Sequence, residues 1–250
     1  MQPLVSIITP SFNQGEFIEE TIKSVLAQTY RPIEYIVMDG GSVDETKDIL
    51  SRYSGRLSWV SEKDGGQGDA VNKGFARARG EILGWLNSDD TYEPIAVSTV
   101  VRYFQEHPDV VMVYGDAYHM DKKGRVTTQY PTEPFSLKRL WRFSFLCQPA
   151  VFIRSEVFRE VGPLDISLQV AMDYDYWCRI GLNYGARRIG FLQGVHLANS
   201  RLYYEAKTLR LRKSVYREAM LVQKKHFGRI HPKWIFGYFK RFVLRIPYRL

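Results

Sequence analysis

The first 86 residues alternate short apolar runs with segments of helical periodicity, and this alternation constrains the fold most strongly. The apolar runs, at 5–9, 33–38, 57–61 and 81–86, have the length and continuity of buried strands. Between them, residues 16–28, 44–53 and 69–79 place apolar side chains at the spacing of one helix face. Strands and helices that alternate in this way predict a doubly wound, mostly parallel, Rossmann-like α/β sheet.

The pattern becomes less regular after residue 94. We expect helices at 94–106, 136–143, 155–161 and 172–184, strands at 110–114, 150–153 and 188–192, and a hairpin turn at 121–124. From residue 205 the chain is basic and predicts a helical extension, broken near Gly228 and Pro232. We therefore divide the chain into a body over residues 1–204, with halves at about 1–115 and 116–204, and a tail over 205–250.

The tail alone makes the protein basic. Residues 201–250 carry 14 Lys and Arg against 2 acidic residues, whereas the other 200 residues carry 21 against 25. An acidic body argues against a nucleic-acid partner. Trp and Phe mixed with Lys and Arg over 234–249 are typical of a helix lying in an anionic membrane interface. They are equally typical of a helix that packs its aromatic face on the body, so both interpretations stay open.

Two cysteines, Cys147 and Cys178, form neither a disulfide framework nor a metal-binding CxxC pattern. Both lie in apolar surroundings, so we expect buried thiols in a reducing compartment. The chain opens without the features of a secretory signal, and no apolar run approaches the length of a membrane span. We expect a cytoplasmic protein, which the membrane interpretation of the tail would place at the inner face of the membrane.

Polar or glycine-rich loops follow all four early strands. Residues 9–13 hold Thr, Ser and Asn, Asp39 opens the second loop, and Asp89 and Asp90 close the fourth. Because the carboxyl ends of parallel strands lie at one edge of a sheet, these loops should converge on one ligand. Adjacent carboxylates there suit a hard divalent cation that also binds phosphate oxygens. The chain lacks GxxxxGK[ST], and no GxGxxG follows the first strand, which weighs against a P-loop NTPase and a dinucleotide-dependent oxidoreductase.

Five segments, at 5–13, 24–30, 37–46, 69–74 and 86–90, together resemble a family 2 glycosyltransferase, in order and with the spacing of that family. The resemblance covers roughly residues 4–200. It implies an A-type glycosyltransferase fold and transfer of a sugar from a nucleotide donor, usually with inversion and with Mn²⁺ or Mg²⁺. It also implies that the first half of the body binds the nucleotide and the second half the acceptor.

The resemblance assigns roles to individual residues. Asp39 matches the carboxylate that receives the N–H of the base, which favours a UDP- or dTDP-sugar. Asp89 ends the DXD-like motif and would hold the metal with Asp90 beside it, whereas Asn87 replaces the usual first Asp and could accept from a ribose hydroxyl. Arg201 would offset charge on the leaving diphosphate. The residues expected to bind the donor are Thr9, Pro10, Ser11, Asn13, Asp39, Gly41, Asp69, Asn72, Lys73, Asn87, Ser88, Asp89 and Arg201.

A later acidic motif supplies the expected catalytic base. Asp173 matches the catalytic Asp of the family, and Met172 replaces the usual Glu. The acceptor hydroxyl must lose a proton as it attacks the anomeric carbon, and a nearby carboxylate can take it. Asp173 and Asp175 diverge on a helix, and we favour Asp173. The alternative is that both only cap the helix.

Three further residues have less definite roles. Tyr203 stands where the family often has a His near the donor phosphates, and His196 is a candidate to replace it. Trp141 lies in the region that would face the acceptor, where its ring could stack on a sugar.

The sequence thus predicts a metal-dependent, inverting glycosyltransferase that acts on a glycan or lipid-linked acceptor in cell-surface polysaccharide synthesis. One alternative is a sugar-1-phosphate nucleotidyltransferase, which would want a basic glycine-rich loop after the first strand. Residues 9–15 contain one Gly and no Lys or Arg. The other alternative is a degenerate, non-catalytic module that binds a membrane surface through the tail, against which the retained acidic residues argue.

Overall fold

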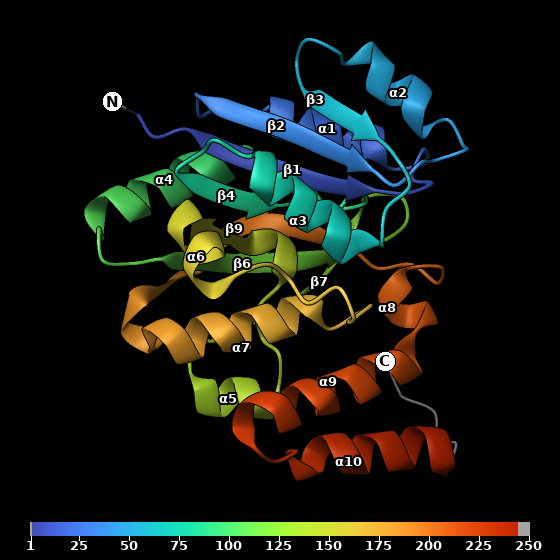
Figure 1. The fold of residues 1–250 in the computed structure, drawn as a ribbon, viewed down its shortest axis with the longest axis vertical. Coiled ribbons are helices and arrows are strands. Elements are labelled where there is room, and N and C mark those ends of the chain that lie inside the picture. Colours follow the sequence, from blue (N-terminus) through green and yellow to red (C-terminus); the bar gives the residue numbers. More distant parts are fainter. Residues whose placement is uncertain (1, 245–250) are drawn as a thin grey trace.

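A nine-stranded sheet runs through the structure, a computed structural model that describes residues 2–244 (Figure 1). The strand order is β3-β2-β1-β4-β8-β6-β9-β5, with β7 paired to β6. The strands are β1 (Val5–Ser11), β2 (Ile33–Asp39), β3 (Ser58–Ser61), β4 (Ile82–Trp85), β5 (Thr91–Tyr92), β6 (Met112–Met120), β7 (Val126–Gln129), β8 (Val151–Arg154) and β9 (Ile189–Arg201).

Helices connect the strands and continue after the last one. They are α1 (Ile18–Leu26), α2 (Thr46–Arg52), α3 (Gln67–Arg77), α4 (Ala96–Glu106), α5 (Leu137–Arg142), α6 (Ser155–Val161), α7 (Met172–Tyr184), α8 (Lys207–Arg210), α9 (Arg212–Phe227) and α10 (Pro232–Tyr238). Short 3₁₀ turns occur at Gln148–Ala150 and Ala186–Arg188, and a π-helical turn at Phe239–Val243 follows α10.

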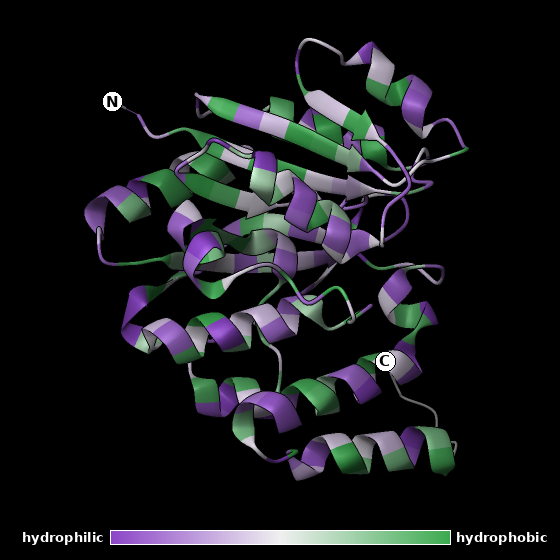
Figure 2. Cartoon of the chain, in the orientation of Figure 1, coloured by the Kyte–Doolittle hydropathy of each residue, from purple (hydrophilic) through white to green (hydrophobic). Residues whose placement is uncertain are grey.

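The predicted doubly wound sheet is confirmed. Strands β3, β2, β1 and β4 pair in parallel. Successive side chains of β1 point to opposite faces, so Ile7 joins the core cluster that includes Ile22 of α1 and Val100 of α4. Ile8 joins the cluster on the other face, with Phe75 of α3. Figure 2 shows the apolar residues concentrated along the strands and the inward helix faces.

The second half of the body continues the same sheet. Strand β8 lies antiparallel between β4 and β6, β9 runs parallel to β6, and β7 returns along β6 through the predicted turn at 121–124. The boundary that we placed near residue 115 falls inside β6, so the two halves of the body share one sheet. Apolar content stops near residue 115 while the backbone pairing continues through polar residues such as Asp116 and His119, which is why hydropathy placed the strand end too early.

The tail packs on the body, as one of the two interpretations predicted. Helix α9 lies beside α7, and α10 lies beyond α9 (Figure 1). The indole of Trp234 donates to the carbonyl of Arg142 (3.1 Å), and that of Trp141 donates to the carbonyl of Arg229 (3.1 Å). Arg245, Ile246, Pro247, Tyr248 and Arg249 of the predicted membrane segment lie outside the described residues.

Both cysteines are buried free thiols, as expected. Over the described part of the chain, no helix has the length and apolarity that crossing a membrane requires.

Candidate active site

The predicted convergence of strand ends is present in the structure. Strands β1, β2 and β3 end level with one another, because Ser11 pairs with Asp39 and Asp39 pairs with Ser61. Strand β4 lies on the other side of β1 and leads into residues 86–90. The loops that follow these strands therefore meet at one edge of the sheet, the position at which open α/β sheets bind ligands.

Asp39 organises the loop after β2. Its buried carboxylate accepts from the amides of Gly41 (3.2 Å) and Ser42 (2.9 Å) and from the hydroxyls of Ser61 (2.6 Å) and Ser42. Gly41 has φ +83°, a conformation that other residues rarely adopt. The carboxylate is thus held rigidly at the sheet edge, and its contact with a nucleotide base stays a prediction.

The loop after β1 contains an open polar atom. The hydroxyl of Thr9 pairs with that of Tyr35 (3.1 Å), and the side chain of Asn13, at φ 51°, accepts from the amide of Val43 (2.9 Å). The hydroxyl of Ser11, by contrast, is buried without a hydrogen-bond partner among the described residues. Since buried polar groups are nearly always paired, the hydroxyl of Ser11, the last residue of β1, indicates a ligand at this strand end. Pro10 lies within β1.

Asn87 is the centre of a hydrogen-bond network that uses its whole side-chain amide. Its Oδ1 accepts from the indole of Trp85 (2.8 Å) and from Gln67 Nε2 (2.8 Å). Its Nδ2 donates to Gln148 Oε1 (2.9 Å) and to Asp90 Oδ2 (3.2 Å). Both lone pairs and both protons of the amide are used, so the expected acceptance from a ribose hydroxyl has no free atom. Ser88 beside it is buried.

The two carboxylates of the DXD-like motif have different surroundings. Asp90 is buried, with Oδ1 accepting from the Arg201 amide (2.8 Å) and Oδ2 from Asn87, and burial together with the charge of Asp89 raises its pKa well above the usual range. Asp89 is only partly buried and accepts from the Tyr203 hydroxyl (3.2 Å); burial raises its pKa as well. Raised pKa values indicate carboxylates that lack enough positive charge nearby, which a bound cation would supply. Only Asp89 has the open face for this, so the expected metal contact of Asp90 gains no support.

Arg201 holds this loop instead of facing outward. Its Nε donates to the carbonyl of Asp89 (2.8 Å), and Nη1 donates to the carbonyls of Asp121 (3.1 Å) and Lys122 (3.0 Å). Its Nη2 pairs with Glu20 (2.6 Å). The side chain is 1% exposed. Because these bonds surround the guanidinium, we expect it to act on a donor diphosphate through the loop and not by direct contact.

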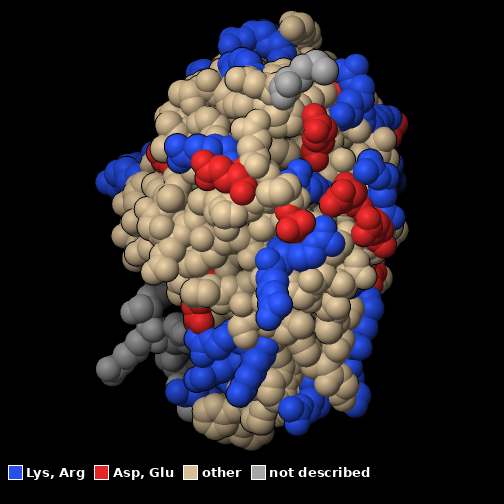
Figure 3. Space-filling model, turned by 90° about the vertical axis from the view of Figure 1, so that its left-hand side faces the viewer, with Lys and Arg blue, Asp and Glu red and all other residues tan. Residues whose placement is uncertain are grey.

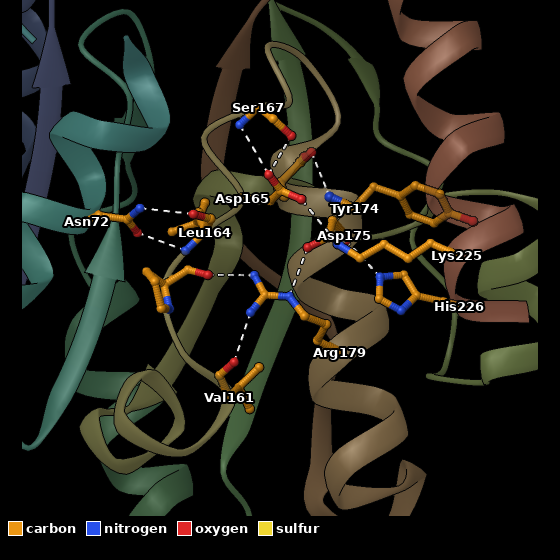
Figure 4. A network of polar contacts seen from close by, with 12 residues as sticks. Asn72, Val161, Leu164, Asp165, Ser167, Tyr174, Asp175, Arg179, Lys225 and His226 are labelled. Atoms are coloured by element: carbon orange, nitrogen blue, oxygen red, sulfur yellow. Dashed lines mark hydrogen bonds and ion pairs between the residues drawn. The ribbon is translucent and has the colours of Figure 1, made fainter. Parts of the chain in front are cut away.

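The expected donor residues of α3 serve as connections in this structure. Asp69 pairs with Lys73 (3.1 Å), which also pairs with Glu62 (3.3 Å). The amide of Asn72 binds both the N–H (2.8 Å) and the carbonyl (3.0 Å) of Leu164, as Figure 4 shows. Asn72 thereby ties α3 to the segment that leads to α7. Donor contacts of these residues stay predictions.

Asp173 and Asp175 are separated by their partners, as their spacing on a helix indicated. Asp175 is fully buried between α7 and α9, paired with Arg179 (2.8 Å), Lys225 (3.1 Å) and His226 (2.7 Å) (Figure 4). Although burial opposes the charge of Asp175, the His226 hydrogen bond and the two cations lower its pKa to about 2. Asp173 is partly exposed, accepts from the Tyr174 amide (2.7 Å), and has its pKa raised to about 6 by burial. Asp173 is therefore the better placed of the two to exchange a proton.

The sequence analysis missed Lys207, the first residue of α8. Its Nζ donates to Gln67 Oε1 (3.1 Å), and Gln67 in turn donates to Asn87 of the DXD-like loop. Burial lowers the pKa of Lys207, and the charge of Lys207 lowers the pKa of Asp173. Lys207 is thus a cation linked to both halves of the site. Nothing in the sequence distinguishes it from the other cations of the tail.

Two expected contributors lie elsewhere. His196 bonds Asn199 Oδ1 (2.8 Å) and approaches Glu93 (3.6 Å) near the β5–β9 pair, so it does not replace a metal-binding His beside Asp89. The ring of Trp141 is covered by the guanidinium of Arg229, 4.7 Å from its centre, and supports the tail. One face of the Trp141 ring is therefore occupied by Arg229, and stacking of Trp141 on a sugar stays a prediction.

Comparisons with known proteins place the chain in a family. The family model described as "Glycosyl transferase family 2" matches residues 6–162. A glycosyltransferase of Rickettsia prowazekii is 32% identical over 183 residues, which are 70% of this chain and 58% of that protein. The chain spans less than two thirds of the length of the first such relatives.

Solved structures share the fold. TarS residues 1–349 of Staphylococcus aureus, in complex with UDP-GlcNAc, align with a TM-score of 0.74 at 18% identity, covering 97% of this chain and 76% of that one. A mannosyltransferase of Pyrobaculum calidifontis, in complex with GDP-Man and Mn²⁺, aligns with a TM-score of 0.70 at 17% identity, covering 97% and 71%. The A-type glycosyltransferase fold expected from the sequence is thereby confirmed.

Proposed function

This chain belongs to glycosyltransferase family 2, and from that premise we propose a metal-dependent, inverting transfer of a sugar from a nucleoside diphosphate sugar to an acceptor hydroxyl. A UDP- or dTDP-sugar is the favoured donor, and the acceptor is a glycan or lipid-linked glycan of the cell surface. Family membership gives no support to the alternative of a sugar-1-phosphate nucleotidyltransferase.

The observation that carries the proposal is the pair of partly exposed carboxylates, Asp89 and Asp173, whose pKa values burial raises. Asp89 follows β4 at the sheet edge, and Asp173 lies in the first turn of α7. The charge of Lys207 lowers the pKa of Asp173, and Lys207 Nζ donates to Gln67, which donates to Asn87 in the same loop as Asp89. Carboxylates with raised pKa values are characteristic of acid–base and cation-binding sites.

Asp173 would act as general base. With a pKa near 6, the carboxylate is ionised at neutral pH yet remains able to accept a proton. It would take the proton of the acceptor hydroxyl while that oxygen forms its bond to the anomeric carbon and the bond from carbon to the diphosphate oxygen breaks on the opposite face. The proton ends on Asp173 and the electron pair on the diphosphate. Because the new bond forms on the face opposite the bond that breaks, the configuration at the anomeric carbon inverts. Lys207 would stabilise the charge that develops.

A divalent metal fits this donor set in a limited way. In the described residues, no group of three or more His, Cys, Asp or Glu could hold a metal by itself. Asp89 offers one open carboxylate, and Mn²⁺ or Mg²⁺ commonly binds through one or two carboxylates together with substrate phosphates and waters. The metal, when bound with the donor, would neutralise charge on the diphosphate. Tyr203 keeps its proton, because burial and the charge of Asp89 raise its pKa, and donates to Asp89 where a His ligand is frequent in the family.

Isothermal titration of UDP into the full chain, with and without Mn²⁺, tests the donor site. We expect binding that Mn²⁺ strengthens, and that Asp89→Ala weakens at least tenfold. Asp109→Ala is the matched control, since Asp109 is an exposed acid in the loop before β6, at the opposite end of the sheet. Titration of dTDP and GDP under the same conditions tests the preference assigned to Asp39.

If none of the three nucleotides binds, the proposal is contradicted and the degenerate, membrane-binding alternative is favoured. Binding that is indifferent to Mn²⁺ and to Asp89→Ala would contradict the metal assignment alone. Where UDP binds, hydrolysis of UDP-sugars by the wild type and by Asp173→Asn then tests the base.

A lipid-linked acceptor is supported by the surface of the tail. Tyr216 of α9 packs against Trp234 and Phe242, with ring centres 5.5 and 5.6 Å apart. The opposite side of the same segment leaves Phe236 67% and Phe239 47% exposed. Lys and Arg side chains predominate over the lower part of the molecule in Figure 3. Exposed aromatic residues beside cations suit an anionic membrane interface.

Sedimentation with vesicles tests this surface. We expect the chain to bind vesicles of phosphatidylglycerol and not those of phosphatidylcholine, and expect the double variant Phe236→Ser/Phe239→Ser to lose binding. Leu221→Ser, an exposed apolar residue of α9, is the control. Equal binding by the double variant and the wild type would contradict a membrane role for α10.

A further inference from the structure

Glu218 of α9 reaches across to the loop that leads into α7. Its Oε2 accepts from three consecutive backbone N–H groups, those of Gln169 (3.0 Å), Val170 (2.8 Å) and Ala171 (3.1 Å). Ala171 is the N-cap of α7, and Asp173 is the second residue of that helix. A carboxylate from a distant part of the chain thus fixes the backbone immediately before the expected base.

The chemistry of this contact is suited to fixing a loop. Of the three donors, the N–H of Ala171 belongs to the N-cap, which has no partner within the helix, and the helix dipole favours negative charge near this end. Hydrogen bonds to a carboxylate are shorter and stronger than those between neutral groups. Three such bonds to one oxygen therefore hold the φ and ψ angles of residues 169–171, and with them the entry of α7.

A second contact joins α9 to α7 on the other side of Asp173. About two turns beyond Glu218, Lys225 and His226 of α9 pair with Asp175 of α7 (Figure 4). The two contacts lie on either side of Asp173 in sequence, at Ala171 and at Asp175. The charge of Glu218 also raises the pKa of Lys207, which burial otherwise lowers. Glu218 thereby touches the loop before the base and influences the cation beside it.

We propose that Glu218 is a positioning residue of the active site, which places the carboxylate of Asp173 through the backbone of residues 169–171. The inference rests on the proposed function, since that function gives Asp173 its task. It goes further in making the C-terminal extension part of the active site: a chain that ends before α9 would keep Asp173 but not its placement.

The charge on Asp173 should respond to Glu218. The positive charge of Lys207 in α8 favours the ionised form of Asp173. The charge of Asp173 in turn raises the pKa values of three buried neighbours, Tyr130, Cys147 and Cys178. Removing the carboxylate at position 218 leaves the N-terminal end of the α7 dipole unopposed and admits water to the loosened loop. Both changes favour the ionised form of Asp173 and lower its pKa.

The test compares Glu218→Gln and Glu218→Met with Glu205→Gln, the other acidic residue of the tail, which is exposed. The first readout is hydrogen exchange of the full chain, followed in peptides that cover residues 165–175. The second is the ¹³C NMR titration of aspartate carboxyl groups, with the signal of Asp173 assigned by its loss in Asp173→Asn. Neither readout needs a nucleotide or an acceptor.

For Glu218→Met we expect exchange in residues 169–174 at least tenfold faster than in the wild type, and an Asp173 titration displaced by about half a pH unit or more toward low pH. Glu218→Gln keeps one acceptor oxygen and should retain part of the protection, while Glu205→Gln should match the wild type in both readouts. An unchanged titration of Asp173 in both Glu218 variants would overturn the proposal, even if the variants melt at lower temperature. Failure of the nucleotide titrations would instead refute the donor site and leave these results standing.

Discussion

Replacing Arg201 by Met tests whether this residue holds the acidic loop or contacts the donor. Met keeps most of the volume of the buried side chain and removes its charge and donors. The guanidinium donates to the carbonyls of Asp89, Asp121 and Lys122 and lies 4.9 Å from the ring centre of Phe17. The backbone N–H of residue 201 still reaches Asp90 in the variant, so the change isolates the side chain.

The magnitude follows from these contacts. Each of the three bonds to a carbonyl contributes about 1 kcal/mol, and the desolvated cation–π contact with Phe17 about 1 kcal/mol more. The pair with Glu20 adds little, because Glu20 is 51% exposed and its charge is screened by water. We expect Arg201→Met to lower the free energy of unfolding by about 4 kcal/mol and the melting temperature by about 10 °C for a chain of this size.

Urea denaturation followed by tryptophan fluorescence measures the effect, with UDP titration on the same samples. Arg52→Met is the control, since the Arg52 side chain is 60% exposed and pairs only at 3.6 Å with Glu19; it should change stability by no more than about 0.5 kcal/mol. A loss below about 1 kcal/mol for Arg201→Met would refute the reasoning. Unchanged stability with a large loss of UDP affinity would show that Arg201 contacts the diphosphate, as the sequence resemblance implied.

Three further predictions concern the carboxylates. Asp173→Asn should lower the rate of transfer by about 10²–10⁴-fold with little change in UDP affinity. The wild-type kcat should fall about tenfold per pH unit below about pH 6, since Asp173 must be ionised to accept a proton. A flat kcat profile between pH 5 and 8 would contradict the assignment of Asp173 as the base. Asp175 has a folded-state pKa of about 2, below its value in the unfolded chain, so its ion pairs stabilise the protein above about pH 4 and their contribution of about 2 kcal/mol disappears as the pH falls toward 2. Urea titrations at pH 7 and pH 3 should show a smaller drop for Asp175→Asn than for the wild type, and parallel drops would count against it. Asn87→Asp should destabilise the chain by about 1–3 kcal/mol, because it removes the two N–H donors of the Asn87 amide and places a second carboxylate beside Asp90. Greater stability together with tighter Mn²⁺ binding would mean instead that the substitution restores a metal ligand.

The parallel half of the fold was predictable because its signals are local and agree with one another. Each early strand is a short, mostly apolar run, and each following helix has one apolar face with the 3.6-residue period, so the two kinds of segment were easily told apart. The later strands were shortened because β6 and β9 continue through polar residues that satisfy one another, such as Asp116 with the Gly194 amide. The two-residue strand β5 carries no periodicity at all, and only its pairing with β9 defines it.

The location of the site was predictable from the sequence, but the contacts that each side chain makes there were not. The sequence placed Asp39, Asp89 and Asp173 at the right ends of their elements, since strand ends and helix starts follow from the periodicity. The sequence did not indicate that the polar atoms of Asn87, Asp90 and Arg201 are already hydrogen-bonded within the protein, because their partners lie up to 181 residues away in the chain. Lys207 and Glu218 were missed for the same reason: their neighbours are remote in the chain, and both look like ordinary surface charges.

The position of β8 has a consequence for synthesis and for exchange of parts between relatives. Strand β8 is made some 65 residues after β4, yet it is the partner of β4, with Ile82 opposite Arg154 and Gly84 opposite Phe152. A nascent chain that has reached only β6 therefore exposes the unpaired edge of β4, a surface prone to mispairing with other chains. Chimaeras that graft the second half of the body of one relative onto the first half of another must carry β8 in a register that fits the host strand β4, or they inherit that open edge.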